Sequence, residues 1–125
     1  MNNPKTLLVI EDDPRFRRTL AAFLEDSGYR VLVAADGQEG LRLAAEEHPD
    51  LVLTDLRMPV MDGLEFIIQI KASGRKLPII VISGTGDEKA QSEAVNQGAV
   101  ECLRKPIDDM QVLQSTIERV LASEK

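Results

Sequence analysis

Short apolar runs alternate with longer amphipathic segments along the whole chain, and this alternation constrains the fold more than any other feature. Four runs, at residues 6–10, 30–34, 51–54 and 79–82, are almost continuously apolar without strict alternation. That pattern is typical of parallel strands buried on both faces. A fifth, more polar run spans residues 100–104. Since parallel strands need long crossover connections, the segments between the runs are predicted to be helices that cover the sheet.

Five helical segments are predicted between and after these runs. Asp13 before Pro14 marks the start of the first, and Gly28 stands where its C-cap belongs. The other four are predicted at residues 37–47, 64–73, 87–97 and 109–121. Apolar side chains at helical spacing are expected to face the sheet. In the first, second, third and fifth helices these are Phe16, Leu20, Phe23, Leu24, Leu41, Ala44, Ala45, Leu64, Ile67, Ile68, Met110, Leu113, Ile117 and Val120.

The fourth helix differs from the others because it is poor in apolar residues. Its apolar residues are Ala90, Ala94 and Val95, so burial holds it only weakly against the sheet. Thr85 followed by Glu88 matches a capping box at its start. We therefore expect a firmly started but loosely seated helix, suited to be a moving part.

Five consecutive strand–helix units define the fold class. With right-handed crossovers they make a three-layer α/β sandwich around a parallel sheet. We expect one domain over residues 1–125, with a core at about 5–121 and a short tail or linker start at 122–125. The hydrophobic pattern alone does not fix the order of the strands.

Charge and composition narrow the function classes. The 15 Lys and Arg against 21 Asp and Glu give a formal charge of −6, which argues against non-specific nucleic-acid binding. The single cysteine, Cys102, excludes an internal disulfide framework and a cysteine zinc cluster, and it favours a reducing compartment. No apolar run approaches membrane-spanning length, and the polar start lacks the apolar core of a secretory signal. We expect a soluble, cytoplasmic protein that contacts neither membrane nor nucleic acid directly.

Acidic residues follow the first and third apolar runs, at the sheet edge where open α/β sheets bind ligands. Glu11, Asp12 and Asp13 follow the first run, and Asp55 follows the third. Asp13 has a structural task as the N-cap, which leaves the other three acids facing the site. Carboxylates at short range repel one another, so a cation is expected among them. Hard carboxylate oxygens, with waters filling the remaining positions, are the ligands that Mg²⁺ accepts.

A hydroxyl and an ammonium complete this edge. Ser83 follows the fourth run, and Lys105 follows the fifth. With a carboxylate nucleophile at Asp55 and a divalent ion, they are the components of a phosphoryl-transfer site, in which positive groups and hydrogen-bond donors hold the anionic oxygens. The sequence therefore predicts phosphoryl chemistry with Mg²⁺ as the cofactor.

Several motifs, in this order and at these spacings, resemble a known family. They are residues 7–13 (LLVIEDD), 51–59 (LVLTDLRMP) with 61–63 (MDG), 79–83 (IIVIS), and Lys105 with Pro106. Over residues 6–121 the chain is similar to the receiver domain of two-component response regulators, the CheY-like family. The resemblance implies a flavodoxin-like, doubly wound sheet of strand order 2-1-3-4-5, with the site at its topological switch point.

The resemblance also implies a role for each acidic residue of the site. Asp55 would accept a phosphoryl group from the phosphohistidine of a sensor histidine kinase or a phosphotransfer protein. Glu11, Asp12 and Asp55 would hold Mg²⁺ together with the backbone carbonyl of Arg57. The domain would be a signalling module with self-catalysed phosphotransfer and autodephosphorylation rather than a turnover enzyme.

A second part of the resemblance concerns signal relay. The hydroxyl of Ser83 would move to a phosphoryl oxygen, Lys105 would pair with the phosphoryl group, and the loop after Ser83 and the fourth helix would take a second arrangement. The peptide bond between Lys105 and Pro106 would be cis. Arg57 and Thr85 occupy positions that tune dephosphorylation in the family.

Cys102 departs from the family pattern, because many receivers carry an aromatic switch residue at that position. The usual rotation of an aromatic ring is therefore in doubt, and whether Cys102 replaces it functionally is open. Also open are the cognate kinase, the output domain or target, whether the chain is a fragment, the lifetime of the phosphorylated state, and phosphorylation-dependent pairing of two copies.

Three alternatives come from other function classes. A metal-dependent phosphatase with an aspartyl nucleophile would place a second Asp two residues later, where this chain has Arg57. A flavin-binding protein would need a phosphate-cradling loop after the first run, where Glu11 and Asp12 would repel phosphate. A docking module that works without phosphorylation would not need the full set of acids and lysine.

Overall fold

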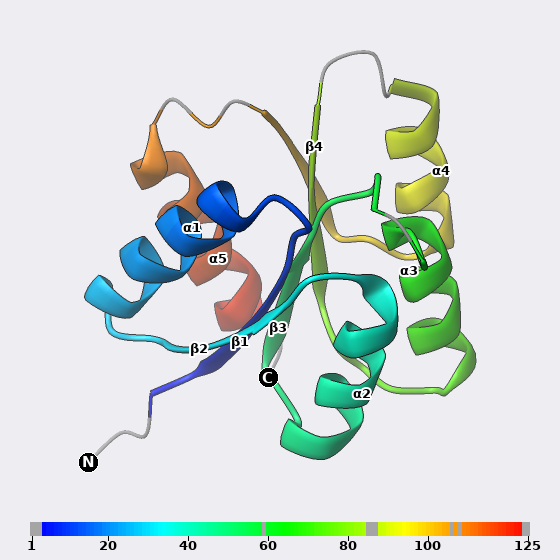
Figure 1. The fold of residues 1–125 in the computed structure, drawn as a ribbon, viewed down its shortest axis with the longest axis horizontal. Coiled ribbons are helices and arrows are strands. Elements are labelled where there is room, and N and C mark those ends of the chain that lie inside the picture. Colours follow the sequence, from blue (N-terminus) through cyan, green and yellow to red (C-terminus); the bar gives the residue numbers. More distant parts are fainter. Residues whose placement is uncertain (1–3, 59, 85–87, 106, 108, 124–125) are drawn as a thin grey trace.

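The computed structural model describes residues 4–123 except 59, 85–87, 106 and 108. Five parallel strands form one sheet in the order β2-β1-β3-β4-β5, and the predicted doubly wound α/β fold is confirmed (Figure 1). The elements are β1 (Thr6–Ile10), α1 (Pro14–Asp26), β2 (Arg30–Ala34), α2 (Gly37–Glu47), β3 (Leu51–Thr54), α3 (Gly63–Ala72), β4 (Ile79–Ser83), α4 (Glu88–Gln97), β5 (Glu101–Arg104) and α5 (Met110–Ser123). None of the helices in the described ranges is long and apolar enough to cross a membrane.

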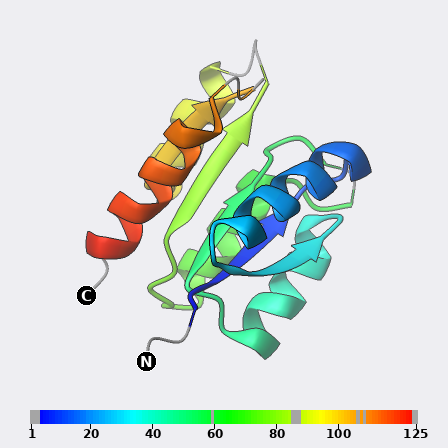
Figure 2. The same cartoon turned by 90° about the vertical axis from the view of Figure 1, so that its left-hand side faces the viewer.

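The sheet separates two layers of helices. Helices α1 and α5 cover one face, and α2, α3 and α4 cover the other (Figure 1 and Figure 2). Because successive strand residues point to opposite faces, Leu7 and Val9 belong to the cluster under α1 and α5, whereas Leu8 and Ile10 belong to the other. Strands β1, β3 and β4 are buried along their whole length. This two-sided burial explains why their sequences are continuously apolar.

The strand register brings the carboxyl ends of neighbouring strands together. Ile10 at the end of β1 pairs with Ala34 of β2 and with Thr54 of β3. Its carbonyl accepts the N–H of Asp55 at 3.1 Å. At the ends of β4 and β5, the N–H of Lys105 donates to the carbonyl of Ser83 at 2.7 Å. The polar residues that follow the strands therefore gather at one edge.

The predicted start of α1 at Asp13 is confirmed. Asp13 Oδ1 accepts the N–H of Arg15 at 3.0 Å at the start of α1. Asp36 is the N-cap of α2, and its Oδ1 accepts the N–H of Glu39 at 2.9 Å. The C-cap of α1 is Ser27, one residue before the predicted Gly28, and Gly28 follows it with φ of 101°. Glycine adopts this left-handed conformation without a steric penalty.

Two predicted core positions are wrong. Ile68 is 37% exposed, and α3 instead buries Phe66 and Ile70 along with the predicted Ile67. Both stripes have helical spacing, but the stripe that contains Phe66 buries the larger apolar area. Ala45 is likewise exposed, because the stripe of α2 is centred on the neighbouring Ala44.

The ends of several elements differ by one or two residues from the predicted ends. Strand β4 extends through Ser83, β5 begins at Glu101, α3 begins and ends one residue early, and α5 runs from Met110 to Ser123. Terminal residues of helices and strands are the least sharply defined part of any element. These differences leave the positions of the site residues unchanged.

Helix α4 is weakly buried, as predicted. Ala94 is buried, but Val95 is 51% exposed, and the remaining residues of the helix are polar or only partly covered. The predicted capping residue Thr85 lies outside the described residues. The described part of α4 therefore has little apolar contact to hold it in place.

Candidate functional site

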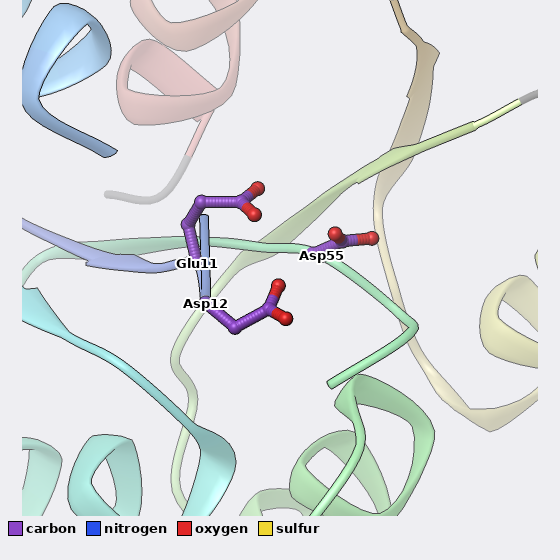
Figure 3. A group of neighbouring side chains, drawn as sticks. All are labelled: Glu11, Asp12 and Asp55. Carbon is purple, nitrogen blue, oxygen red and sulfur yellow. The ribbon is translucent and has the colours of Figure 1, made fainter. Parts of the chain in front are cut away.

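Three acidic side chains converge at the carboxyl ends of β1 and β3. One carboxylate oxygen each from Glu11, Asp12 and Asp55 lies within 4.8 Å of the others (Figure 3). Glu11 is 2% and Asp55 is 8% exposed, whereas Asp12 is open to solvent. A cation at this position could bind protein oxygens on its inner side and water on its outer side.

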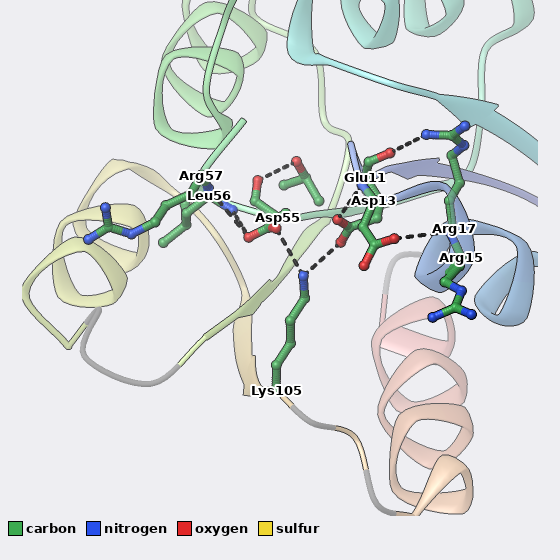
Figure 4. Close-up of polar contacts among 9 residues, drawn as sticks. Glu11, Asp13, Arg15, Arg17, Asp55, Leu56, Arg57 and Lys105 are labelled. Carbon is green, nitrogen blue, oxygen red and sulfur yellow. Dashed lines mark hydrogen bonds and ion pairs between the residues drawn. The ribbon is translucent and has the colours of Figure 1, made fainter. Parts of the chain in front are cut away.

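Lys105 reaches this cluster from the end of β5. Its ammonium donates to Glu11 Oε1 at 2.9 Å and to Asp55 Oδ2 at 3.0 Å (Figure 4). The three residues are far apart in sequence, and the parallel strands β1, β3 and β5 bring them to one edge. The structure therefore brings together the predicted acids and the predicted lysine.

The electrostatics of the cluster favour an additional cation. Burial raises the pKa of Glu11, and the hydrogen bond from Lys105 opposes this rise only in part. Burial acts to lower the pKa of Lys105, but its hydrogen bonds to Glu11 and Asp55 raise that pKa overall. Three ionised carboxylates and one ammonium leave a formal charge of −2 in a partly buried space. A divalent ion would neutralise this charge.

The carboxylate of Asp55 is held in a fixed orientation. Its Oδ1 accepts the backbone N–H of Leu56 at 2.7 Å and that of Arg57 at 3.3 Å, and its Oδ2 accepts from Lys105 (Figure 4). The backbone of Arg57 thus lies beside the carboxylate, while its side chain is exposed. The role of the Arg57 carbonyl as a metal ligand stays a prediction.

The loop after Asp55 packs closely against two glycines, Gly63 at the start of α3 and Gly37 at the start of α2. A Cβ on Gly63 would collide with the carbonyl oxygen of Asp55, and one on Gly37 would lie 2.7 Å from the carbonyl oxygen of Met61. Val60 in the same loop has φ of 70° and is 77% exposed. That conformation is unfavourable for a β-branched residue. The loop is therefore tightly placed but contains local strain.

Ser83 ends β4 and is completely buried. Its carbonyl accepts the N–H of Lys105, so the two residues lie on adjacent strand ends. The predicted movement of the Ser83 hydroxyl to a phosphoryl oxygen remains a prediction. Thr85 and the peptide bond that was predicted to be cis, between Lys105 and Pro106, lie outside the described residues.

Cys102 lies on β5 under helix α4. It is half-buried, and its Sγ donates weakly to the carbonyl of Gln91 at 3.8 Å. Burial, with the charge of Glu101 as a smaller contribution, raises the pKa of the thiol. A thiol with a raised pKa is a poor nucleophile near neutral pH. The position that often carries an aromatic switch residue is thus occupied by a small, half-buried side chain.

Two residues of α1 contribute to the site in a way that the sequence pattern does not predict. The Phe16 ring centroid lies 4.7 Å from the Lys105 ammonium. Arg17 Nη1 donates to the carbonyl of Glu11 at 2.7 Å. The helical spacing of Phe16 indicates a core position, and no local pattern connects it with a lysine late in the chain.

Comparison with known families agrees with this geometry. The model of the response regulator receiver domain family matches residues 7–118. The chain therefore belongs to the response regulator receiver domains of two-component signalling systems, as its motifs predicted.

Individual relatives show the same relationship. The transcriptional regulatory protein GlrR of Escherichia coli (strain K12) is 36% identical over 107 residues, which cover 86% of this chain and 24% of GlrR. The response regulator MprA of Mycolicibacterium vanbaalenii is 38% identical over 103 residues, which cover 82% of this chain and 45% of MprA. The chain thus spans less than half the length of these curated relatives.

Solved structures of similar proteins have the same fold. A response regulator receiver domain protein from Clostridium thermocellum superimposes with a TM-score of 0.89 and 32% identity, covering 94% of each chain. The chemotaxis protein CheY4 of Vibrio cholerae superimposes with a TM-score of 0.87 and 30% identity, covering 94% of this chain and 99% of CheY4. The fold of this chain is therefore CheY-like over nearly its whole length.

Proposed function

We propose that this domain accepts a phosphoryl group on Asp55 from the phosphohistidine of a sensor histidine kinase or a phosphotransfer protein, with Mg²⁺ as cofactor. The observation that carries the proposal is the position of the Lys105 ammonium, 3.0 Å from Asp55 Oδ2 and 2.9 Å from Glu11 Oε1. This ammonium borders three acids whose oxygens lie within 4.8 Å of one another. Membership of the receiver family supports the same chemistry.

In the proposed transfer, a carboxylate oxygen of Asp55 attacks phosphorus while the N–P bond of the phosphohistidine breaks and the imidazole leaves. The N–H groups of Leu56 and Arg57 hold the carboxylate in one orientation during the attack. Lys105 is close enough to pair with an oxygen of the arriving group and to offset its negative charge. Later attack by water on the acyl phosphate would release phosphate and restore the carboxylate.

Glu11, Asp12 and Asp55 suit Mg²⁺ because they offer hard oxygen ligands on one side only. The exposed carboxylate of Asp12 leaves space for water in the remaining positions, and the Arg57 carbonyl is the proposed fourth protein ligand. When bound, the ion would neutralise the charge of the transferring phosphoryl group.

The relay is proposed to run through Ser83 and helix α4. The Ser83 hydroxyl would turn to a phosphoryl oxygen, and the loop that follows would move with it toward a second arrangement. Helix α4 would follow at small cost, since Ala94 is its buried residue. With Cys102 in place of an aromatic ring, no ring rotation takes part in this relay. Arg57 and Thr85 are the proposed modulators of dephosphorylation.

The longer relatives suggest how the domain is used. GlrR is named a transcriptional regulatory protein and MprA a response regulator, and this chain matches only part of each. We propose that the whole protein couples phosphorylation in the cytoplasm to an output region or target protein. Pairing of two copies through α4, β5 and α5 is a further hypothesis.

The proposal is tested by adding Mg²⁺ and a small phosphodonor such as acetyl phosphate and measuring the mass of the intact protein. The unaltered domain should gain one phosphoryl group, and chelation of Mg²⁺ should prevent the gain. Asp55→Asn should gain none. Asp13→Asn is the matched control, because Asn also caps helices and Asp13 is a cap rather than a proposed ligand. It should be phosphorylated normally.

Each other outcome would contradict the proposal. Phosphorylation that persists in Asp55→Asn would assign the acceptor elsewhere. A domain that is never labelled would support a docking module. Multiple turnover of a phosphomonoester would support a phosphatase.

A further inference from the structure

The ammonium of Lys105 has a third neighbour besides its two carboxylates. The ring of Phe16 lies under it, with 4.7 Å between the ring centroid and Nζ. Both side chains border a surface hollow of about 630 Å³ between α1 and the segment after β5, together with Ile107 and Met110. Glu11 and Asp55 each accept one hydrogen bond from this ammonium. The ring therefore covers a side of the cation that would otherwise face water in the hollow.

The first turn of α1 is fixed to the same carboxylate that holds the lysine. Glu11 Oε2 accepts the N–H of Asp13, the N-cap of α1, at 3.0 Å. The Glu11 carbonyl accepts from Arg17 at 2.7 Å. Since Glu11 Oε1 binds Lys105 at 2.9 Å, the ring of Phe16 and the ammonium are positioned relative to one residue. Their contact thus belongs to a connected, partly buried arrangement.

We infer that Phe16 is a positioning residue for Lys105. The negative face of its ring attracts the ammonium, and this attraction keeps the lysine directed at Asp55 instead of turning into the hollow. A leucine would fill similar space but has no such face. The consequence for phosphorylation rests on the proposed function of Asp55, whereas the contact between ring and ammonium does not.

The first test is the rate of phosphorylation by acetyl phosphate at saturating Mg²⁺. Phe16→Leu should slow it roughly two- to fivefold, the range expected for a partly exposed cation–π contact. Replacing Phe16 by phenylalanine with one, two and three ring fluorines should slow it stepwise, because fluorine weakens the ring face with little change in size. A purely structural role for Phe16 would give no such graded series.

Phe23 provides a matched control on the same helix. It packs against the same apolar cluster as Phe16 and is also half-buried. Fluorination of Phe23, or Phe23→Leu, should leave the phosphorylation rate unchanged. Equal effects at the two positions would overturn the proposal, because they would reflect packing of α1 alone.

The second test uses folding and is independent of phosphorylation. The loss of unfolding free energy caused by Phe16→Leu should be larger in the unaltered protein than in a Lys105→Met background. Equal losses in the two backgrounds would show no coupling and overturn the inference. Coupling without a graded effect on rate would overturn the positioning role. Coupling in a protein that is never labelled would support the contact while refuting the proposed function of Asp55.

Discussion

Helices α1 and α4 both begin near the edge of the sheet that carries the site, yet they are held very differently. Helix α1 starts at an Asp13 cap and buries Leu20 and Leu24 almost completely. Its first turn is also hydrogen-bonded to Glu11. Helix α4 buries Ala94, and its ion pair from Glu88 to Arg104 is largely exposed, so it stabilises by at most about 1 kcal/mol.

The residues of the site therefore lie next to the firmly held helix α1, and the helix proposed to move is the weakly held α4. The acids and the lysine need constant geometry, and the α1 side provides it through buried leucines and hydrogen bonds to Glu11. A signalling element has to change position for a small free energy, and α4 loses little apolar contact when it moves. The site residues are therefore firmly held next to α1, whereas α4 is packed weakly against β4 and β5.

The largest expected effect contrasts the cores of the two helices. Leu20→Ala in α1 should lower the free energy of unfolding by about 3 kcal/mol, because Leu20 is 1% exposed and its removal leaves a cavity. Val95→Ala in α4 should change it by less than about 0.5 kcal/mol, since Val95 is 51% exposed. Urea titration followed by far-ultraviolet circular dichroism measures both. Similar losses from the two variants would remove the contrast between the helices.

Binding of Mg²⁺ should stabilise the folded protein, mainly at residues 11–17 next to the site. At ten times its dissociation constant, Mg²⁺ should raise the free energy of unfolding by about 1.4 kcal/mol. Hydrogen exchange should slow more at residues 11–17 than in α4. Asp12→Asn should remove most of this gain, because Asp12 is an exposed proposed ligand whose replacement disturbs no packing. An undiminished gain in this variant would place the ion elsewhere.

The same contrast explains what could be predicted from the sequence. The apolar runs predicted the strands. The polar residues at their ends, such as Asp55 and Lys105, were correctly predicted to lie together, because parallel strands end at the same edge of the sheet. The predicted stripe of α3 is wrong at Ile68, since two stripes share helical spacing and only packing selects between them. The sequence predicts only a core position for Phe16, because its contact with Lys105 depends on tertiary structure.

A smaller gain is expected in the loop after β3, which lies on the side of Asp55 away from α1. Val60 adopts φ of 70° and is 77% exposed. Val60→Asn should raise the free energy of unfolding by about 1 kcal/mol, because asparagine tolerates this conformation better than a β-branched residue. Thermal unfolding measures the gain. Val33→Asn, at an exposed position in β2, is the control and should give no gain.

The subtlest prediction concerns Glu11, which joins α1 to the site. Burial raises the pKa of Glu11 above its ordinary value of 4.5, and the hydrogen bond from Lys105 only partly opposes this. The folded protein therefore binds this proton more readily than the unfolded chain. The stability that the group contributes is present at low pH and is lost as the pH rises through the raised pKa.

Glu11→Gln has no proton to lose at this position. Without Mg²⁺, the unfolding free energy of the variant minus that of the unaltered protein should therefore increase as the pH rises from 4.5 toward neutrality, measured by urea titration at each pH. Saturating Mg²⁺ should reverse the trend, because the ion stabilises the ionised carboxylate and binds the variant less well. A difference that falls with pH in the absence of Mg²⁺ would mean that Lys105 outweighs burial, and that the α1 side is held mainly by the ion pair.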